Sequence, residues 1–580
     1  MFADHSNIPL KIGKWKVSFY ELAAFGVILL DFCMRFALIY QGWPRSNSDE
    51  GTLGLMALHI AYHGAFPLFF YGQGYMGPLE AYVGAALFLL LGTTVLALRT
   101  GVLLLFTFFL VLMYRLARQL YNKTLALITL ILLSLGTPEI LLRETLAQAG
   151  HPETPLFCAA IILFSVQLAL SIHSRSEDAA LQRRGKRLLL YSLWGLLMGV
   201  AFWNDFLIWP FVLLAAFSLW LFCRSELRQL EYVGILLGFL TGIVPAIIYN
   251  LTAPINQSSF SVFGFLIAYH HAPISSSLLD KLAGSLLVSL PIATGANPLC
   301  PLQSGQAWPL SQLSSYGLRC TLVHGGWGLA LIVLWVVAFV PAIRELLRSR
   351  HHLFKAADSF ADERNDERKE AIFRFARVMI LAGAGLSFVV FALSAQSVTD
   401  PWANNRYLVA LAVAVPAMLW PLWSTTKAAG RLASAKLAVQ RALIGGALLV
   451  FTASLILGTI ATFAQIPTEQ RFNRQQDALV GDLLQLHITH MYTDYWTCDL
   501  TAFLSRERIT CDVLDEQLQQ GVNRYTPYIA MVEHDPNAAY VFPIGSPQSA
   551  AFAQKNAQDR LHYRLIAADT YDIFLPASPS

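Results

Sequence analysis

The sequence predicts a polytopic α-helical membrane protein with about eleven transmembrane helices and a small C-terminal α/β domain. Of its 580 residues, 56% are hydrophobic and only 13% are charged, whereas a soluble globular protein has about 25% charged residues. Apolar stretches of about 20 residues, the length that crosses a bilayer, recur through the first 463 positions. Lys and Arg concentrate in alternate connections between these stretches. A soluble enzyme is excluded, and a net charge of +4 gives no basic surface for a nucleic acid.

The first predicted span is Tyr20–Tyr40. It is long enough to cross a bilayer and lacks the cleavage site of a signal peptide, so we expect it to be retained. A further apolar segment, Pro78–Leu98, is predicted to be an interfacial or re-entrant helix, because counting it as a span would reverse the side of every later loop. The eleven predicted spans cover residues 20–40, 98–117, 123–141, 155–173, 188–203, 206–222, 231–250, 321–341, 375–395, 405–424 and 442–463.

Basic residues predict the orientation of these spans. With the N-terminus in the cytoplasm, the inner segments hold most of the Lys and Arg residues, as the positive-inside rule requires. The inner segment 344–374 carries both charge signs densely and is typical of a solvated helical or disordered loop. We therefore expect a multi-pass plasma-membrane protein with an extracytoplasmic C-terminal domain. The outer loops between helices hold only Arg45, Arg99, Arg143, Lys281, Arg319 and Arg406.

The composition changes near residue 463 and divides the chain into two domains. Residues 1–463 are predicted to form the transmembrane domain, with a long first outer loop over residues 41–98. Residues 465–580 have the polar composition of a soluble domain and contain short alternating runs at Tyr528–Glu533 and Ala539–Ile544. This pattern predicts a small α/β domain on the outer face.

Four of the seven cysteines form two neighbouring pairs in outer segments. Cys300 is followed by Cys320, and Cys498 is followed by Cys511. Disulfides persist in oxidising compartments, so this topology makes Cys300–Cys320 and Cys498–Cys511 candidate bridges. Chance pairing is the alternative.

Carboxylates gather in the predicted outer loops and helix ends. Charged groups beside a bilayer are costly, so this gathering indicates a site for protons, cations or a polar substrate. Asp49 and Glu50 are the acids that follow the first span most closely, and they precede apolar residues at helical spacing. Taken alone, such a pair could instead be a helix cap with a favourable charge in the first turn. Within the first span, Asp31 and Arg35 are expected to pair with each other. The outer acids are Asp49, Glu50, Glu80, Glu139, Glu144, Glu153, Asp205, Asp280 and Asp400.

The first outer loop resembles that of C-type membrane glycosyltransferases. It has an acidic pair after the first span, an amphipathic helix, an aromatic turn ending in the step Gly77, Pro78, Leu79, and a re-entrant helix. Similar patterns occur in protein O-mannosyltransferases of family 39, in aminoarabinose transferases acting on lipid A and in bacterial galacturonic-acid transferases. Later, RETLAQAGHPETPLF resembles the second acidic loop of the family, and DPWANNRYLVALAVAVP resembles its Arg-Tyr step entering a late helix. The resemblance covers roughly residues 15–425.

The resemblance implies a transferase that moves a sugar from a polyprenyl-phosphate donor to a glycan, lipid or protein acceptor on the extracytoplasmic face. Asp49, with Glu50 beside it, would supply the general base. The donor phosphate would be bound by Arg406 and Tyr407, with Arg143 and Arg45 as further cations. The second acidic loop contributes Glu144, His151 and Glu153.

Two features of the resemblance stay open. Some relatives have a Lys just before the Pro-Leu step, where this chain has Tyr75, Met76 and Gly77. A phosphate contact made by that Lys must come from another cation here or be absent. The substitutes include His270 and His271, which could also be only an exposed polar pair in a long outer loop. The sequence requires no cofactor, but the spacing of His151 and Glu153 leaves a divalent metal ion as an alternative.

Two other function classes also stay open. A transporter or flippase for a lipid or polysaccharide would have many spans as well. Transporters usually place ionisable residues or broken helices near the membrane midplane, and this chain has few there beyond Asp31 and Arg35. A polymerase or ligase of surface polysaccharide would share the same general layout. Substrate flux without a glycosidic product would favour the transporter over the transferase.

Overall fold

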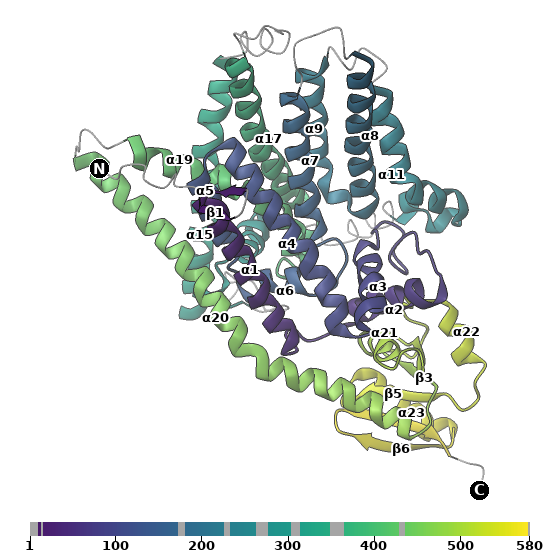
Figure 1. Cartoon of the computed structure of the whole chain (residues 1–580). Coiled ribbons are helices and arrows are strands. Elements are labelled where there is room, and N and C mark those ends of the chain that lie inside the picture. Colours follow the sequence, from purple (N-terminus) through teal and green to yellow (C-terminus); the bar gives the residue numbers. More distant parts are fainter. Residues whose placement is uncertain are drawn as a thin grey trace.

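The computed structural model describes residues 10–12, 15–171, 180–224, 232–262, 277–302, 314–348, 365–428 and 435–577. Long helices form a bundle, and a small sheet lies beyond one end of that bundle (Figure 1). Within the described residues, eight helices are long and apolar enough to cross a membrane, or nine if one bent pair forms a single span. The predicted fold class, a helical multi-pass membrane protein with a small C-terminal α/β domain, is confirmed.

The elements of the first half of the chain come in this order. They are β1 (Leu10–Ile12), β2 (Trp15–Val17), α1 (Phe19–Tyr40), α2 (Ser48–His63), α3 (Leu79–Leu91), α4 (Val95–Leu120), α5 (Lys123–Leu133), α6 (Pro138–Thr145), α7 (Glu153–Leu170), α8 (Ala180–Asn204), η2 (Phe206–Ile208), α9 (Trp209–Phe222), α11 (Tyr232–Thr252) and η3 (Ile255–Gln257).

The second half ends in the sheet. Its elements are α13 (Leu278–Gly284), η4 (Ser285–Ser289), α14 (Leu290–Thr294), η5 (Asn297–Leu299), α15 (Ser315–Arg348), α17 (Asn365–Leu393), α18 (Gln396–Thr399), η8 (Ala403–Ala414), α19 (Val415–Ala428), α20 (Ala435–Gln485), β3 (His490–Thr493), α21 (Tyr495–Leu504), β4 (Thr510–Val513), α22 (Pro527–Glu533), β5 (Ala539–Pro543), α23 (Pro547–Asp559), β6 (Tyr563–Ala568) and β7 (Tyr571–Pro576).

Three of the eleven predicted spans differ from the set of long apolar helices. The predicted span 123–141 is broken into α5 and α6, which meet at an angle of 93°. The break follows from Gly136 and from Pro138, because the residue before a proline is driven out of the helical conformation. The spans predicted at 188–203 and 206–222 correspond to α8 and to a 17-residue helical segment, Phe206–Phe222, and neither belongs to the set. The number eleven therefore stays a prediction.

Helix α3 begins inside the segment that the sequence assigns to the first outer loop. It is 13 residues long, so at 1.5 Å per residue it extends only about 20 Å, less than the thickness of a hydrocarbon core. It packs against α2 and α4. Its length agrees with an interfacial or re-entrant helix rather than a span.

Glycines allow two helices of the bundle to touch along their backbones. A Cβ atom on Gly195 or Gly199 of α8 would collide with the backbone of α11, and one on Gly238 or Gly242 of α11 would collide with α8. Small residues are the usual means of close helix packing in membranes, where burial of apolar surface provides little driving force. The two helices run side by side at the edge of the bundle (Figure 1).

The long helix α20 connects the bundle with the sheet (Figure 1). Its 51 residues extend about 76 Å, and the domain boundary predicted near residue 463 falls inside it. The sheet has the order β4-β3-β5-β7-β6, with β3 parallel to both of its neighbours and β7 antiparallel to both of its own. The alternating run Ala539–Ile544 contains strand β5, whereas Tyr528–Glu533 lies in helix α22, which Pro527 starts at its first turn.

Both cysteine pairs singled out in the sequence are disulfide-bonded. The Cα atoms of Cys300 and Cys320 are 5.4 Å apart, which joins the end of η5 to α15. The Cα atoms of Cys498 and Cys511 are 5.5 Å apart, which joins α21 to β4.

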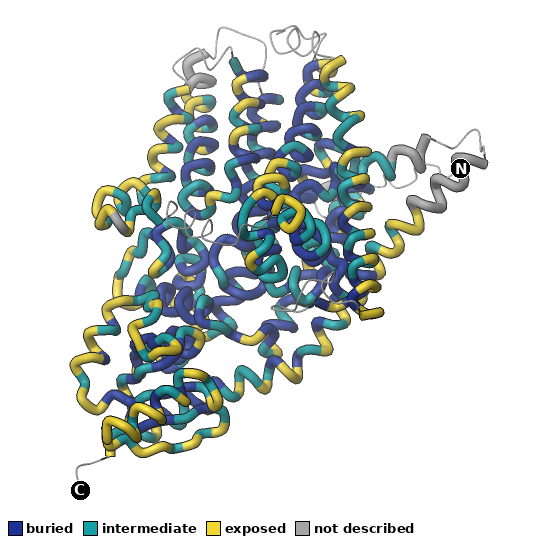
Figure 2. Tube along the Cα trace, turned by 180° about the vertical axis from the view of Figure 1, so that it is seen from behind, coloured by how far each residue is buried: buried dark blue, intermediate teal, exposed yellow. Residues whose placement is uncertain are grey.

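The C-terminal domain packs directly on the first outer loop. Helix α2 is buried over most of its length between α3 and α21, and one buried apolar cluster includes Leu53, Phe88 and Phe503. A Cβ atom on Gly51 would lie 2.5 Å from the backbone nitrogen of Leu500, so α2 and α21 touch main chain to main chain. Figure 2 shows this continuous buried region between the bundle and the sheet.

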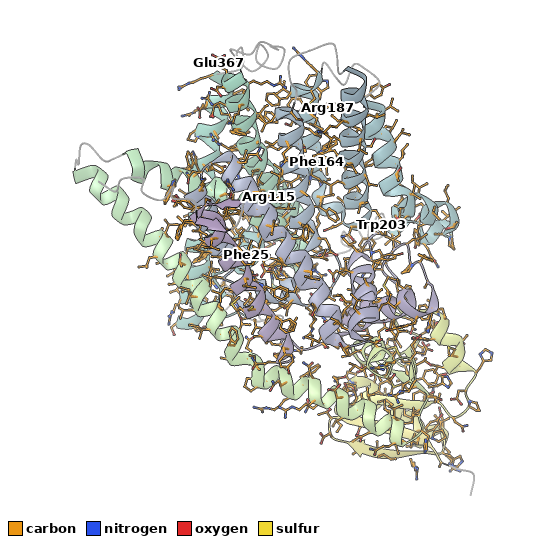
Figure 3. The ribbon with its side chains drawn as sticks, viewed as in Figure 1. Phe25, Arg115, Phe164, Arg187, Trp203 and Glu367 are labelled. Carbon is orange, nitrogen blue, oxygen red and sulfur yellow. A yellow bond between two sulfur atoms is a disulfide. The ribbon has the colours of Figure 1, made fainter. Side chains whose placement is uncertain are left out.

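The opposite end of the bundle carries segments that the sequence assigns to the inner side. Arg187 of α8 and Glu367 of α17 lie at the end of the bundle far from the sheet, whereas Trp203 lies toward the end where α2 and α3 are found (Figure 3). The predicted loop 344–374 continues from α15, and its residues 349–364 lie outside the described part of the chain.

Candidate functional site

The site begins at the first turn of α2. Asn47 is the N-cap residue, and its side chain accepts a hydrogen bond of 2.9 Å from the backbone of Glu50. Asp49 and Glu50 therefore lie in the first turn, where the helix dipole favours negative charge. Because Asn47 caps the helix, neither Asp49 nor Glu50 is needed as its N-cap residue.

Glu50 is enclosed in a buried ion pair. Its two carboxylate oxygens accept hydrogen bonds of 2.7 Å from Nε and Nη2 of Arg99, and the same Nη2 donates to Ser46 at 3.1 Å. The Glu50 side chain is fully buried. Both oxygens of this carboxylate are thus occupied by the guanidinium of Arg99.

Asp49 instead faces the C-terminal domain. Its Oδ1 accepts hydrogen bonds from the Tyr495 hydroxyl at 2.8 Å and from Arg524 Nη2 at 3.2 Å. Arg524 also donates to the Tyr495 hydroxyl at 2.9 Å, and its guanidinium lies 5.1 Å from the centre of the Phe70 ring. Asp49 retains 22% exposure of its side chain. Among the described residues, no hydrogen bond reaches its Oδ2.

A group of cations lies close to Asp49. Arg406 of η8 interacts electrostatically with Asp49 and with Tyr75, and its guanidinium stacks 5.3 Å from the Tyr407 ring. Its Nη2 lies 3.5 Å from the Tyr407 hydroxyl. These two contacts with Tyr407 orient the guanidinium of Arg406.

Two further groups of the second acidic loop join Arg406. Arg143 of α6 and His151 both interact electrostatically with Arg406 and with each other. Burial, with the charges of Arg406 and Arg143, lowers the pKa of His151 well below its ordinary value. The buried guanidinium of Arg143, the partly buried guanidinium of Arg406 and a neutral imidazole make this a place that would stabilise an anion.

Two further carboxyl groups, those of Glu80 and Asp205, have raised pKa values. Burial and the neighbouring Glu153 carboxylate raise the pKa of Glu80 well above its ordinary value, although its Oε2 accepts a hydrogen bond of 3.0 Å from the backbone of Gln148. Burial also raises the pKa of Asp205 to about 6, against the hydrogen bonds from Leu207 and Thr154. A protonated Glu80 can donate a hydrogen bond, whereas Asp205, with a pKa of about 6, is mostly ionised at neutral pH.

The other predicted residues are engaged elsewhere or lie outside the described residues. Arg35 pairs with Asp31, as the spacing predicts, and also with Glu144, whose carboxylate lies 3.2 Å from its Nε. Arg45 is 60% exposed and its Nε lies 3.1 Å from Glu469 of α20. The remaining candidates, His270 and His271, fall outside the described part of the chain.

Gly77, the residue before Pro78, lies where a side chain would collide with α8. A Cβ atom on Gly77 would lie 2.5 Å from the Cα atom of Asn204, and the Gly77 nitrogen donates a hydrogen bond of 2.9 Å to the Asn204 carbonyl. A lysine at this position would collide with α8. The aromatic turn is thus fixed against the bundle, and the cations of the site come from η8, α6 and the C-terminal domain.

Two groups of described residues bring three potential metal-ligating side chains within 4.8 Å of one another. The first consists of His59, His63 and Glu507. The second consists of Cys498, Asp499 and Cys511, but its two cysteines are bonded to each other in a disulfide. His151 and Glu153 belong to neither group, and a metal requirement at the site stays a prediction.

Tyr495 and Arg524 were not predicted. They lie in the C-terminal domain, which the resemblance to C-type glycosyltransferases does not cover. They are 446 and 475 positions from Asp49 in the sequence. Only the packing of α21 against α2 brings them to the first outer loop.

Comparisons with known proteins agree on the fold. Neither the protein-family models nor the sequences of curated proteins gave a match. Among solved structures, ArnT from Cupriavidus metallidurans in the apo state matches at 14% identity with a TM-score of 0.50, over 96% of this chain and 100% of that one. The same protein bound to undecaprenyl phosphate matches at 15% identity with a TM-score of 0.51, over 97% and 98%.

The oligosaccharyltransferase AglB from Archaeoglobus fulgidus, in complex with an inhibitory peptide and a dolichol-phosphate, matches at 12% identity with a TM-score of 0.44, over 94% of this chain and 73% of that one. ArnT is a glycosyltransferase of the C type. The likeness to ArnT over nearly the whole length of both chains shows that this chain has the C-type membrane glycosyltransferase fold.

Proposed function

We propose that this protein is a membrane glycosyltransferase that moves a sugar from a polyprenyl-phosphate donor to an acceptor on the extracytoplasmic face, with Asp49 as the general base. One observation carries the proposal. In a fold shared end to end with a protein that binds undecaprenyl phosphate, a partly exposed carboxylate lies within electrostatic reach of the partly buried guanidinium of Arg406.

The proposed reaction is a single displacement at the anomeric carbon. The acceptor hydroxyl forms the new bond to that carbon, its proton passes to Oδ2 of Asp49, and the donor phosphate leaves with the electron pair of the broken bond. The hydrogen bonds from Tyr495 and Arg524 both end on Oδ1, which leaves Oδ2 for the acceptor. Inversion at the anomeric carbon is the expected outcome.

The cation group supplies what the leaving phosphate needs. Arg143, which is buried, and Arg406, which is partly buried, would stabilise the negative charge that develops on the phosphate, because such interactions are stronger away from bulk water. Tyr407 orients Arg406. His151, which is neutral, can donate or accept a hydrogen bond at the same place. Glu50 and Arg99 hold the first turn of α2 in place.

The acceptor can belong to any of three classes, a glycan, a lipid or a protein, provided that it presents a hydroxyl at the membrane surface. The lipid tail of the donor would stay in the bilayer beside α3 and the bundle. Because the pKa of Glu80 is raised well above its ordinary value, its protonated carboxyl is suited to donate a hydrogen bond to a sugar hydroxyl.

The test is product formation in proteoliposomes. The purified chain is reconstituted with radiolabelled polyprenyl-phosphate sugars and with membrane lipids of the source cell as acceptors. The proposal expects a labelled glycoside and released polyprenyl phosphate. Movement of the labelled donor across the bilayer without any glycoside would overturn it in favour of a flippase.

A further inference from the structure

Two histidines and a glutamate meet at the other end of α2, apart from the proposed active site. The Nε2 atom of His59 lies 2.7 Å from Glu507 Oε1, and the Nδ1 atom of His63 lies 3.7 Å from Glu507 Oε2. The two imidazole rings are 5.4 Å apart. One potential ligand atom from each residue lies within 4.8 Å of those of the other two.

The spacing of the histidines places both on one face of α2. They are four residues apart in the sequence HIAYH, which is one helical turn. Histidines spaced in this way are a recurring feature of zinc sites. Glu507 lies in the loop after α21, where Arg506 and Glu507 both have positive φ angles, of 53° and 59°. Such angles are uncommon for residues other than glycine, so the surrounding structure holds Glu507 in this position.

Neighbouring tyrosines hold two of the three groups. Nδ1 of His59 lies 2.8 Å from the Tyr71 hydroxyl, and Glu507 Oε1 accepts a hydrogen bond of 2.8 Å from the Tyr528 hydroxyl. In metal sites, the second nitrogen of a ligating histidine has such a partner, which fixes the ring and its tautomer.

The exposure of the three side chains suits an exchangeable ion. The His59 side chain is only 5% exposed and that of Glu507 20%, whereas His63 is 55% exposed. The group is thus closed on the protein side and open to solvent beside His63. An ion could enter there and complete its coordination with water.

We propose that His59, His63 and Glu507 bind a divalent transition-metal ion of the zinc class, which fastens the C-terminal domain to the end of α2. Two imidazoles and one carboxylate, with water in the fourth position, are a known ligand set for this ion. The site lies ten residues along α2 from Asp49, about 15 Å away, so it takes no part in the proposed sugar transfer. Its effect is to hold Tyr495 and Arg524 against Asp49.

Metal binding to the full-length protein tests this proposal. The chain is purified in detergent with an affinity tag that contains no histidine, stripped with a chelator, and titrated with Zn²⁺ and with Co²⁺, whose visible spectrum reports tetrahedral coordination. The wild type is expected to bind about one ion per chain at this site. His63→Ala is expected to lose that ion, and because His63 lies half exposed at the helix end, its removal leaves the core packing intact.

A matched control is available in the same domain. His490 Nδ1 lies 2.7 Å from Asp535 Oδ2, and this histidine–carboxylate pair belongs to neither group of three potential metal ligands found among the described residues. His490→Ala is expected to bind Zn²⁺ like the wild type. Tyr71→Phe is expected to weaken binding about 10- to 100-fold, the usual effect of removing the partner of a ligating histidine.

A second readout follows the domain contact. Zn²⁺ is expected to raise the thermal unfolding temperature of the wild type and of His490→Ala with increasing concentration, but not that of His63→Ala. A wild type that binds no ion, or a His63→Ala variant that binds Zn²⁺ as tightly as the wild type, would overturn the proposal. If the wild type binds no ion, the two histidines and Glu507 interact only as histidine–carboxylate ion pairs.

Discussion

Arg524 of the C-terminal domain donates a 3.2 Å hydrogen bond to Asp49 in the first turn of α2. The two residues are 475 positions apart, and Tyr495 binds to both of them. The contact makes the C-terminal domain part of the candidate site rather than an appendage to it. The hydrogen bonds from Tyr495 and Arg524 suit this domain to hold the proposed base in position.

Removing Arg524 should reduce transfer without unfolding the protein. In Arg524→Ala, Asp49 loses one of its two orienting donors, and a misplaced catalytic group can lower the rate about 100-fold. The loss is expected in kcat, measured with labelled donor in proteoliposomes. Arg564 on β6 is exposed and serves as the control, so Arg564→Ala should keep the wild-type rate. Equal rates for the two variants would contradict a positioning role.

Glu50 should matter for stability and not for chemistry. Glu50→Gln leaves Arg99 as a buried charge with only part of its hydrogen bonding, and loss of one partner of a buried pair costs about 3–5 kcal/mol. Thermal unfolding in detergent should show a large decrease, whereas the rate per folded molecule should stay near that of the wild type. Unchanged stability together with lost transfer would instead place Glu50 in the reaction.

Arg406 should govern binding of the donor phosphate. A hydrogen bond to a charged group contributes about 1.5–3 kcal/mol, so Arg406→Ala should weaken undecaprenyl-phosphate binding at least about 10-fold. Arg45, which is exposed and contacts Glu469, is the matched comparison. Arg45→Ala should bind the lipid phosphate like the wild type. If Arg45→Ala has the larger effect, the phosphate lies at the end of α20 and not at η8.

The stability of the C-terminal domain should depend on pH through Asp499. Burial raises the pKa of Asp499 to about 6, partly offset by a hydrogen bond from Thr52 and by the charge of Arg524. The folded protein therefore holds a proton that the unfolded chain releases above its ordinary pKa of 3.8. The contribution of this residue to stability accordingly falls as pH rises through the window between these two values.

Unfolding temperatures across that window measure the effect. Asp499→Asn, which stays neutral, should have a flatter pH profile than the wild type and a higher unfolding temperature at neutral pH. Asp559 is exposed on α23, and Asp559→Asn should retain the wild-type profile. Parallel profiles for Asp499→Asn and the wild type would show that Asp499 does not carry this dependence.

The sequence predicts those parts of the molecule that local physics determines. Apolar runs and the distribution of Lys and Arg predict a multi-pass membrane protein, and the spacing of Asp31 and Arg35 predicts their ion pair. The run from Asp49 to Ile60 predicts helix α2. Each of these features depends on residues within a turn or a span of one another.

Other features depend on contacts between distant segments and were beyond such reasoning. The bend between α5 and α6 occurs at a short Gly-Thr-Pro step inside one apolar run, which hydropathy counts as a single span. The different surroundings of Asp49 and Glu50 follow from Arg99 on α4 and Arg524 in the C-terminal domain, and no spacing pattern connects them. The α20 helix, which carries the C-terminal domain to α2, runs through the predicted boundary near residue 463.

The most direct test of the proposed mechanism compares the wild type with Asp49→Asn in single-turnover transfer from a labelled polyprenyl-phosphate sugar, with binding of undecaprenyl phosphate measured on the same samples. The account predicts that Asp49→Asn binds the lipid phosphate but transfers sugar about 100- to 10,000-fold more slowly, since that is the usual contribution of a general base. Asp559→Asn should match the wild type in both measurements. Transfer by Asp49→Asn at the wild-type rate would contradict the assignment of Asp49 as the base.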